Sequence, residues 1–125
     1  MRYVFSVPLQ RDWSHFLNLK ADIWVKALIR RASVENVPGM VVRRGHGEAG
    51  TVYVKVARLD GTADVYGPTW GEDGQRVWMR VSGSQPIADQ DAEAYLVRQA
   101  KFDPDFWVVE LEDKQGRHFL TEPVI

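Results

Sequence analysis

Strict alternation of apolar and polar residues marks two strands in the middle of the chain. In residues 51–57 the pattern sets Val52, Val54 and Val56 against Thr51, Tyr53 and Lys55. In residues 76–81 it sets Val77, Met79 and Val81 against Arg76, Trp78 and Arg80. A period of two is that of a strand with one buried face. Apolar runs predict further strands at 40–44, 64–68, 106–112 and 117–120. We expect the last two to pair as a hairpin.

Apolar residues spaced three and four apart predict two helices, at 18–36 and 88–102. Pro38 and Gly39 end the first helix. Acidic residues crowd the start of the second helix and basic residues its end, which suits the helix dipole. Asp103 stands directly before a proline and therefore ends the second helix.

The order of these elements predicts an α+β fold. We expect a mainly antiparallel sheet of about five or six strands, with two helices packed on one face. The residues before the first helix include a short apolar run, Tyr3 to Val7. This run could add an edge strand to the sheet, and it could equally be an arm that reaches a second subunit.

The composition excludes several classes of function. With 125 residues the chain fits one domain. It has no cysteine, which removes disulfides, thiolate nucleophiles and cysteine-ligated metals and fits a reducing compartment. No apolar run is long enough to span a membrane, and the first residues are too polar for a secretory signal. We therefore expect a cytoplasmic protein without membrane contact.

The segment Gly45–Gly50 reads G-H-G-E-A-G and matches the letters of a dinucleotide-binding loop. Such a loop must open a helix, because the helix N-terminal amides hold the pyrophosphate. Here an alternating strand follows Gly50 at once and leaves no room for a helix. We interpret the segment as a hairpin loop between the strands at 40–44 and 51–57, and we expect no cofactor.

Several segments together resemble a known family. They read LKADIWVKALIRR, VVRRGHGEAGTVYVKV, DVYGP, KFDPDFWVVELED and GRHFL. In this order and spacing, over about residues 19–120, the chain is similar to the alphaproteobacterial domain of unknown function 1491 family. Members of that family usually begin near the first helix, so the resemblance implies an N-terminal extension at 1–18 and a single domain at 19–125. It implies a lineage and a fold, and it carries over no activity, ligand or catalytic residue.

Polar loop residues give two candidate sites. His46 and Glu48 would form an acid–base pair if they met, although two solvated side chains are the more common outcome. Asp103 and Asp105, with two glutamates on the following strand, could hold a divalent cation. We favour the alternative that Asp103 ends the helix and Asp105 hydrogen-bonds the turn. The three histidines lack the spacing of a metal site, so we expect no metal-binding or catalytic residue.

One side of the sheet combines aromatic and basic residues if the valines of 51–57 face the helices together with Val77 and Met79. This outer face would consist of Tyr53, Lys55, Arg76, Trp78 and Arg80. It suits a protein interface, because Tyr, Trp and Arg are enriched at hot spots. It also resembles a stacking platform for single-stranded nucleic acid, although a net charge of −1 disfavours that partner. A third alternative is that another segment of the chain covers it.

We therefore predict a protein that is not an enzyme and that acts by protein–protein contact, as a homodimer or with an unknown protein partner. One alternative is a single-stranded nucleic-acid binder that uses the outer face. Another is a small-ligand protein or enzyme centred on the Gly45–Gly50 loop, which requires a deep pocket beside that loop.

Overall fold

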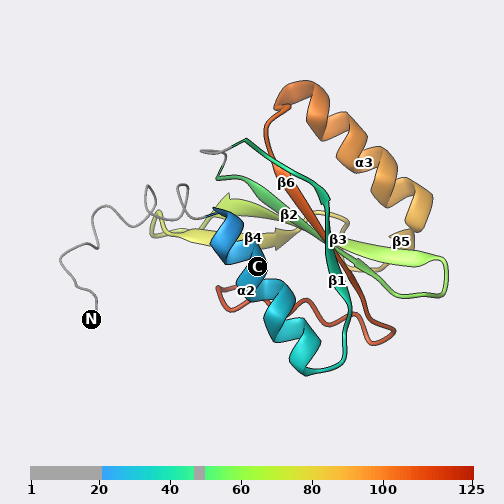
Figure 1. Ribbon diagram of the computed structural model, residues 1–125. Coiled ribbons are helices and arrows are strands. Elements are labelled where there is room, and N and C mark those ends of the chain that lie inside the picture. The colour runs from blue at the N-terminus through green and yellow to red at the C-terminus, as the bar shows by residue number, and fades with distance from the viewer. Residues whose placement is uncertain (1–20, 47–49) are drawn as a thin grey trace, which may run out of the picture.

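A mixed β-sheet lies between two helices in the computed structural model, which describes residues 21–46 and 50–125 (Figure 1). The helices are α2 (Ala21–Val34) and α3 (Asp89–Phe102). The strands are β1 (Gly39–Arg43), β2 (Val52–Ala57), β3 (Thr62–Trp70), β4 (Arg76–Arg80), β5 (Ile87–Ala88) and β6 (Trp107–Glu112). The predicted α+β class and the mainly antiparallel sheet are confirmed. Among the described residues, no helix is long and apolar enough to cross a membrane.

Strand β6 is inserted between β1 and β2, so the sheet order is β1-β6-β2-β3-β4, with β5 also paired to β3. It runs antiparallel to β1 and parallel to β2. The expected hairpin between residues 40–44 and 51–57 is therefore wrong, because these strands are not neighbours. The reason lies in the nearly continuous apolar run of β6, which suits an interior strand buried on both faces.

The two helices cover opposite faces of the sheet (Figure 1). Helix α2 packs on the side that carries Val52, Val54 and Val56. Helix α3 packs on the other side, which carries Val65 and Val108. The prediction that both helices share one face is wrong, because the interior strands are apolar on both sides and each side needs a cover.

Strand β3 is longer than expected and continues through Gly67 and Pro68. Beyond Tyr66 the register of β3 is with β4 alone, and a free strand edge can accommodate a proline. A side chain at position 67 would not fit, since its Cβ would lie 2.7 Å from Cε1 of Tyr53. The glycine thus lets a tyrosine ring pack closely against β3.

The segment after β6 runs to β4 and does not pair back on β6. Residues 117–120 form no strand, so the expected hairpin is wrong. Both edges of β6 are already taken by β1 and β2, which leaves no place for a returning strand. The backbone N–H of Trp78 donates to the Pro123 carbonyl at 2.8 Å, and that of Ile125 donates to the Trp78 carbonyl at 2.8 Å. The last residues therefore cover the outer edge of β4.

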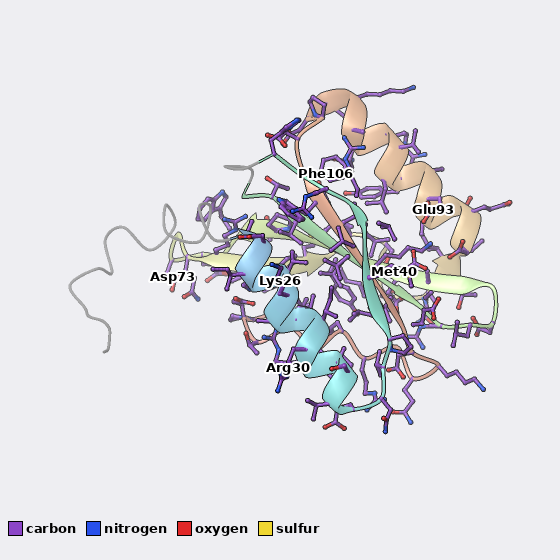
Figure 2. All side chains as sticks on the ribbon, viewed as in Figure 1. Lys26, Arg30, Met40, Asp73, Glu93 and Phe106 are labelled. Carbon is purple, nitrogen blue, oxygen red and sulfur yellow. The ribbon has the colours of Figure 1, made fainter. Side chains whose placement is uncertain are left out.

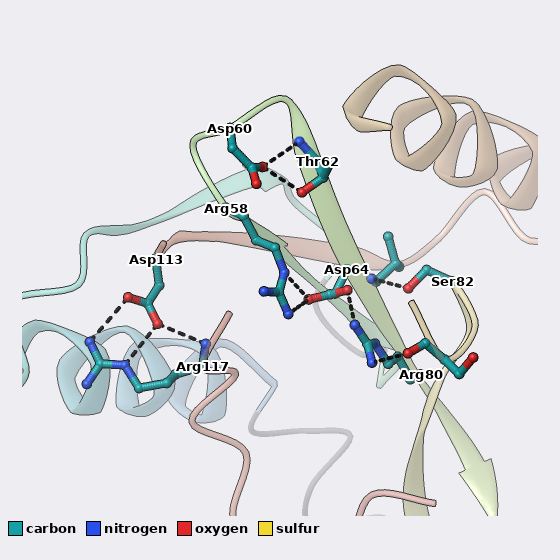
Figure 3. A network of polar contacts seen from close by, with 10 residues as sticks. Arg58, Asp60, Thr62, Asp64, Arg80, Ser82, Asp113 and Arg117 are labelled. Atoms are coloured by element: carbon teal, nitrogen blue, oxygen red, sulfur yellow. Dashed lines mark hydrogen bonds and ion pairs between the residues drawn. The ribbon is translucent and has the colours of Figure 1, made fainter. Parts of the chain in front are cut away.

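Two buried carboxylates tie loops to the sheet (Figure 3). Asp64 has no exposed surface and accepts hydrogen bonds from Nε of Arg58 at 2.9 Å and from Nη2 of Arg80. Asp113 accepts the backbone N–H of Arg117 at 2.8 Å and its Nε–H at 2.9 Å. Hydrogen bonds from Arg117 hold the pKa of Asp113 below its usual range. Both buried charges are thus paired, as a medium of low dielectric requires.

Candidate functional site

The five residues of the predicted outer face lie on two opposite faces of the sheet. Val54 is opposite Tyr66 in the register of β2 and β3, and Tyr66 is opposite Arg80 in the register of β3 and β4. Residues directly opposite one another point to the same side, so Arg80 shares the side of Val54 and not that of Tyr53. The prediction of one common face is therefore wrong. It assumed a register between β2 and β4 that differs by one residue from the observed one, and a shift of one residue turns every side chain of a strand to the other face of the sheet.

Tyr53 faces α3 and is half-buried there. Its ring lies edge-on to Phe106 and Tyr95, with centroids 5.1 and 6.2 Å away. Burial, followed by the effect of Tyr95, raises the pKa of Tyr53 to about 12. The phenol is therefore neutral at physiological pH and serves packing between β2 and α3.

Lys55 also faces α3, and only 2% of its surface is exposed. Its Nζ lies 2.7 Å from Oδ1 of Asp89, 2.5 Å from Oε2 of Glu93 and 3.6 Å from Oε1 of Glu110. Burial by itself lowers the pKa of Lys55, but the hydrogen bonds to Asp89 and Glu93 outweigh it, and the net pKa is raised. The ammonium is thus an internal cation that holds three carboxylates.

Arg76, Trp78 and Arg80 face α2. The indole of Trp78 stacks on Trp24, with 5.4 Å between the ring centroids and 24° between their planes. Arg80 belongs to the buried ion pair of Figure 3, and Nη2 of Arg76 donates to the Gly50 carbonyl at 3.0 Å. Helices of the same chain therefore pack against both aromatic residues of the predicted face.

His46, in the glycine loop, contacts Asp105 on the segment between α3 and β6. Its backbone N–H donates to Oδ1 of Asp105 at 2.7 Å, and its Nδ1 lies 3.2 Å from the same oxygen. These contacts, the backbone hydrogen bond first, lower the pKa of Asp105. Glu48, the other member of the predicted loop pair, lies outside the described residues. Because the His46 side chain is 91% exposed, the pair with Asp105 is open to solvent.

Asp103 and Asp105 take different partners. Asp103 caps the end of α3, and its Oδ1 accepts the backbone N–H of Asp105 at 3.1 Å. The Asp105 carboxylate instead contacts His46. Within residues 21–46 and 50–125, no group of three His, Asp or Glu side chains is arranged to hold a metal ion.

A pocket of about 330 Å³ opens between the start of α2 and the turn that joins β3 to β4. Figure 2 shows Asp73 in that turn, near the end of the molecule where α2 begins. The residues that give the pocket its chemical character are Trp24, Val52, Trp70, Arg76, Trp78 and Glu122. Gly50, the last residue of the glycine loop, also lines it.

Glu122 fixes the two stacked tryptophans of this pocket. Nε1 of Trp24 donates to Oε2 of Glu122 at 3.2 Å, and Nε1 of Trp78 donates to Oε1 at 3.1 Å. Each carboxylate oxygen therefore takes one indole. The arrangement could not be seen in the sequence, because Trp24 and Glu122 are 98 positions apart.

Trp70 and Arg76 stand directly opposite each other across β3 and β4 at the mouth of the pocket. Trp70 is 63% exposed. Burial lowers the pKa of Arg76, and attraction to Glu122 offsets part of that effect. The pocket thus combines an exposed indole with a guanidinium that has lost part of its hydration.

Strand β1 lies at the edge of the sheet and carries exposed apolar side chains. Among the described residues it is paired with β6 alone. Met40, Val41 and Val42 are 42%, 38% and 49% exposed. Figure 2 shows Met40 on β1, between the two helices in that view. Three consecutive apolar side chains therefore lie at an open edge of the sheet.

The comparisons with known proteins agree with the resemblance read from the sequence. A family model described as a protein of unknown function, DUF1491, matches residues 19–121. A crystal structure of a DUF1491 family protein from Caulobacter crescentus CB15 has 48% sequence identity and a TM-score of 0.73, and the match covers 83% of this chain and 96% of that one.

Two solution structures are also similar. The NMR structure of a DUF1491 family protein from Caulobacter crescentus CB15 has 48% identity and a TM-score of 0.72 over 86% of this chain and 97% of that one. The solution structure of protein Atu0922 from A. tumefaciens has 28% identity and a TM-score of 0.69 over 84% and 94%. Among curated proteins, none matches. On the family match and these structures, this chain belongs to the DUF1491 family of proteins of unknown function.

Proposed function

We propose that this protein acts by protein–protein contact and that β1 of one chain pairs with β1 of a second copy. The observation that supports the proposal is the row Met40, Val41 and Val42, exposed on a strand that is hydrogen-bonded on one side within residues 21–46 and 50–125. An open edge of this kind is a template for another strand, and proteins usually cover or charge it. A second copy of β1 would bury the row and satisfy the unpaired backbone groups.

The contrast between the two edges of the sheet supports β1 as the contact. The outer edge of β4 is covered by the backbone of Pro123 and Ile125. No described segment covers β1 in the same way. A homodimer through β1 would therefore leave neither long edge open.

A two-fold antiparallel pairing centred on Val41 fits the residues of β1. It places Val41 opposite its own copy, Met40 opposite Val42, and Gly39 opposite Arg43. Apolar side chains meet apolar side chains, and no like charges face each other across the pair. A two-fold contact also uses the same patch on both chains, as closed dimers do.

Light scattering after gel filtration tests this proposal. At roughly 50 µM, where a contact with a micromolar Kd is largely formed, we expect a mass of twice the chain's 14.3 kDa. Val41→Lys should give a monomer, because two ammonium groups would meet at the two-fold axis.

The matched control is Val97→Lys, which places the same charge on an exposed valine of α3. It should remain dimeric. Both positions are exposed in the single chain, so at concentrations low enough for the parent chain to be monomeric both variants should unfold within about 0.5 kcal/mol of it. A monomeric parent chain, or a Val41→Lys variant that still forms the dimer, would refute the proposal.

The nucleic-acid alternative has lost its support, because the residues of its platform lie on opposite faces of the sheet. The cytoplasmic location, and the division into an extension at 1–18 and a domain at 19–125, stay predictions from the sequence.

A further inference from the structure

The pocket beside Gly50 has the build of a binding site for a flat ring. Trp24 and Trp78 stack on each other, and the two oxygens of Glu122 hold one indole N–H each. These contacts hold both indole rings in place before a ligand binds in the pocket. A wall fixed in advance lowers the ordering cost of binding.

Trp70 supplies an exposed aromatic surface at the mouth of this pocket. Its side chain is largely exposed, and it stands across the strand pair from Arg76. Indole faces stack favourably on flat rings. A planar group that binds between Trp70 and the stacked pair of Trp24 and Trp78 would therefore bury apolar surface of Trp70 that is now exposed to solvent.

Arg76 has hydrogen-bond donors to offer. A guanidinium carries five N–H donors, and the described residues take up one of them, at the Gly50 carbonyl. Glu122, the acidic residue of the pocket, already accepts two indole N–H groups. Its effect on Arg76 is an attraction of charges without a hydrogen bond. The guanidinium can therefore bind a carboxylate through two parallel hydrogen bonds.

The charge of the pocket decides which ligand it favours. Several tryptophans around one cavity also suit an organic cation. Arg76 lies in the wall and repels a cation, whereas the charge of Glu122 is engaged by two donors. The balance favours an anion.

We propose that this pocket binds a small planar aromatic carboxylate, whose ring packs between Trp70 and the Trp24–Trp78 wall and whose carboxylate accepts hydrogen bonds from Arg76. A volume of about 330 Å³ is near the lower end of the range for small-molecule sites. This site is separate from the contact through β1 and does not depend on it.

The test is a titration of the ¹⁵N-labelled full chain, followed through the indole N–H signals of its tryptophans. The probe is indole-3-acetate, which joins a flat ring to a carboxylate. Three compounds separate the contributions: indole-3-acetamide keeps the ring without the charge, acetate keeps the charge without the ring, and tetramethylammonium is a cation. We expect saturable shifts of the Trp24, Trp70 and Trp78 signals with indole-3-acetate. Binding of the amide should be at least about tenfold weaker, since it forms no charge-assisted hydrogen bond.

Two variants and one control locate the site. Arg76→Gln should weaken indole-3-acetate to the level of the amide, and Trp70→Ala should weaken both compounds. Trp70 is exposed, so its replacement keeps the fold and serves if the Arg76 variant does not fold. Arg30→Gln removes an exposed arginine from α2 (Figure 2) and should bind as the parent chain does. The proposal is overturned if indole-3-acetate gives no saturable shift, if the amide binds equally well, or if tetramethylammonium binds in its place.

Discussion

His118 is a half-buried imidazole whose contacts require its neutral form. Its ring lies edge-on to Tyr66, with 4.9 Å between the centroids. Its Nδ1 accepts the backbone N–H of Leu120 at 2.9 Å, and a ring nitrogen that accepts is unprotonated. Burial lowers the pKa of His118 below its ordinary value of 6.5, and attraction to Asp64 offsets part of the effect. Protonation of this ring is therefore coupled to folding.

We predict that the chain loses stability as the pH falls below about 6.5. In that range His118 of the unfolded chain takes up a proton, whereas His118 of the folded chain does so only at lower pH. The unfolded state therefore binds more protons, and the free energy of unfolding decreases as the pH decreases. The loss can reach about 1.4 kcal/mol per pH unit within this window. The loss of stability ends at the lower pH at which His118 of the folded chain is also protonated.

The measurement is urea unfolding of the parent chain and of His118→Gln at pH 7.5 and 5.5. The other titrating groups are common to both chains, so they cancel in the comparison. The parent chain should lose more stability between the two pH values than the variant does. An equal loss in both would show that His118 is not responsible.

At the scale of elements, Lys55 is the polar link between β2 and the start of α3. Its ammonium reaches Asp89 and Glu93 on the helix and Glu110 on β6. Burial raises the pKa of Glu110, and the charge of Lys55 counteracts this. The lysine therefore makes three neighbouring carboxylates compatible with an apolar interface.

We predict that Lys55→Met destabilises the chain by about 2 kcal/mol. Loss of one partner of a buried ion pair typically costs about 3–5 kcal/mol, and the figure here is smaller because Asp89 and Glu93 are partly solvated. Urea unfolding at pH 7 gives the value. The control is Lys26→Met on the exposed face of α2, which should change stability by less than about 0.5 kcal/mol. Equal effects at the two positions would contradict a role for the buried ammonium.

Local patterns were sufficient to predict the position of most elements but not the relation between them. The helical spacing of residues 18–36 and 88–102 and the alternation in 51–57 and 76–81 each correspond to an observed element. Whether Tyr53 and Trp78 share a face depends on the register of two strands with β3, and alternation within one strand carries no information about register. The insertion of β6 beside β2 likewise pairs residues that are 55 positions apart, such as Val52 and Trp107, so neither segment predicts it alone.

The tryptophan pocket could not be predicted from the sequence either, because it joins segments that are far apart along the chain. It brings together the start of α2, the turn after β3 and the C-terminal residues. The spacing of apolar residues puts Trp24 in a helix, and alternation puts Trp78 on a strand, but nothing local indicates that Glu122 bridges their N–H groups. His46 was recognised as a loop residue, whereas its contact with Asp105 again joins distant segments.

At the scale of the whole molecule, other segments of the chain cover most of the sheet. Helices cover both faces, and the C-terminal residues cover the edge of β4. Among the described residues, two surfaces stand apart from this arrangement: the apolar edge of β1 and the pocket with its exposed Trp70. The proposals assign a second copy of the chain to the edge and a small aromatic anion to the pocket.

Cysteine cross-linking at the centre of β1 tests the dimer most directly, because the chain has no cysteine of its own. Residues opposite one another in an antiparallel pair have Cα atoms about 4.5–5.5 Å apart, within the range that a disulfide spans. Val41→Cys, oxidised at roughly 10 µM, should therefore convert almost completely to a covalent dimer on a non-reducing gel. Val97→Cys, on an exposed position of α3, should stay monomeric under the same conditions. A Val41→Cys chain that stays monomeric, or that cross-links no faster than Val97→Cys, would contradict pairing through β1.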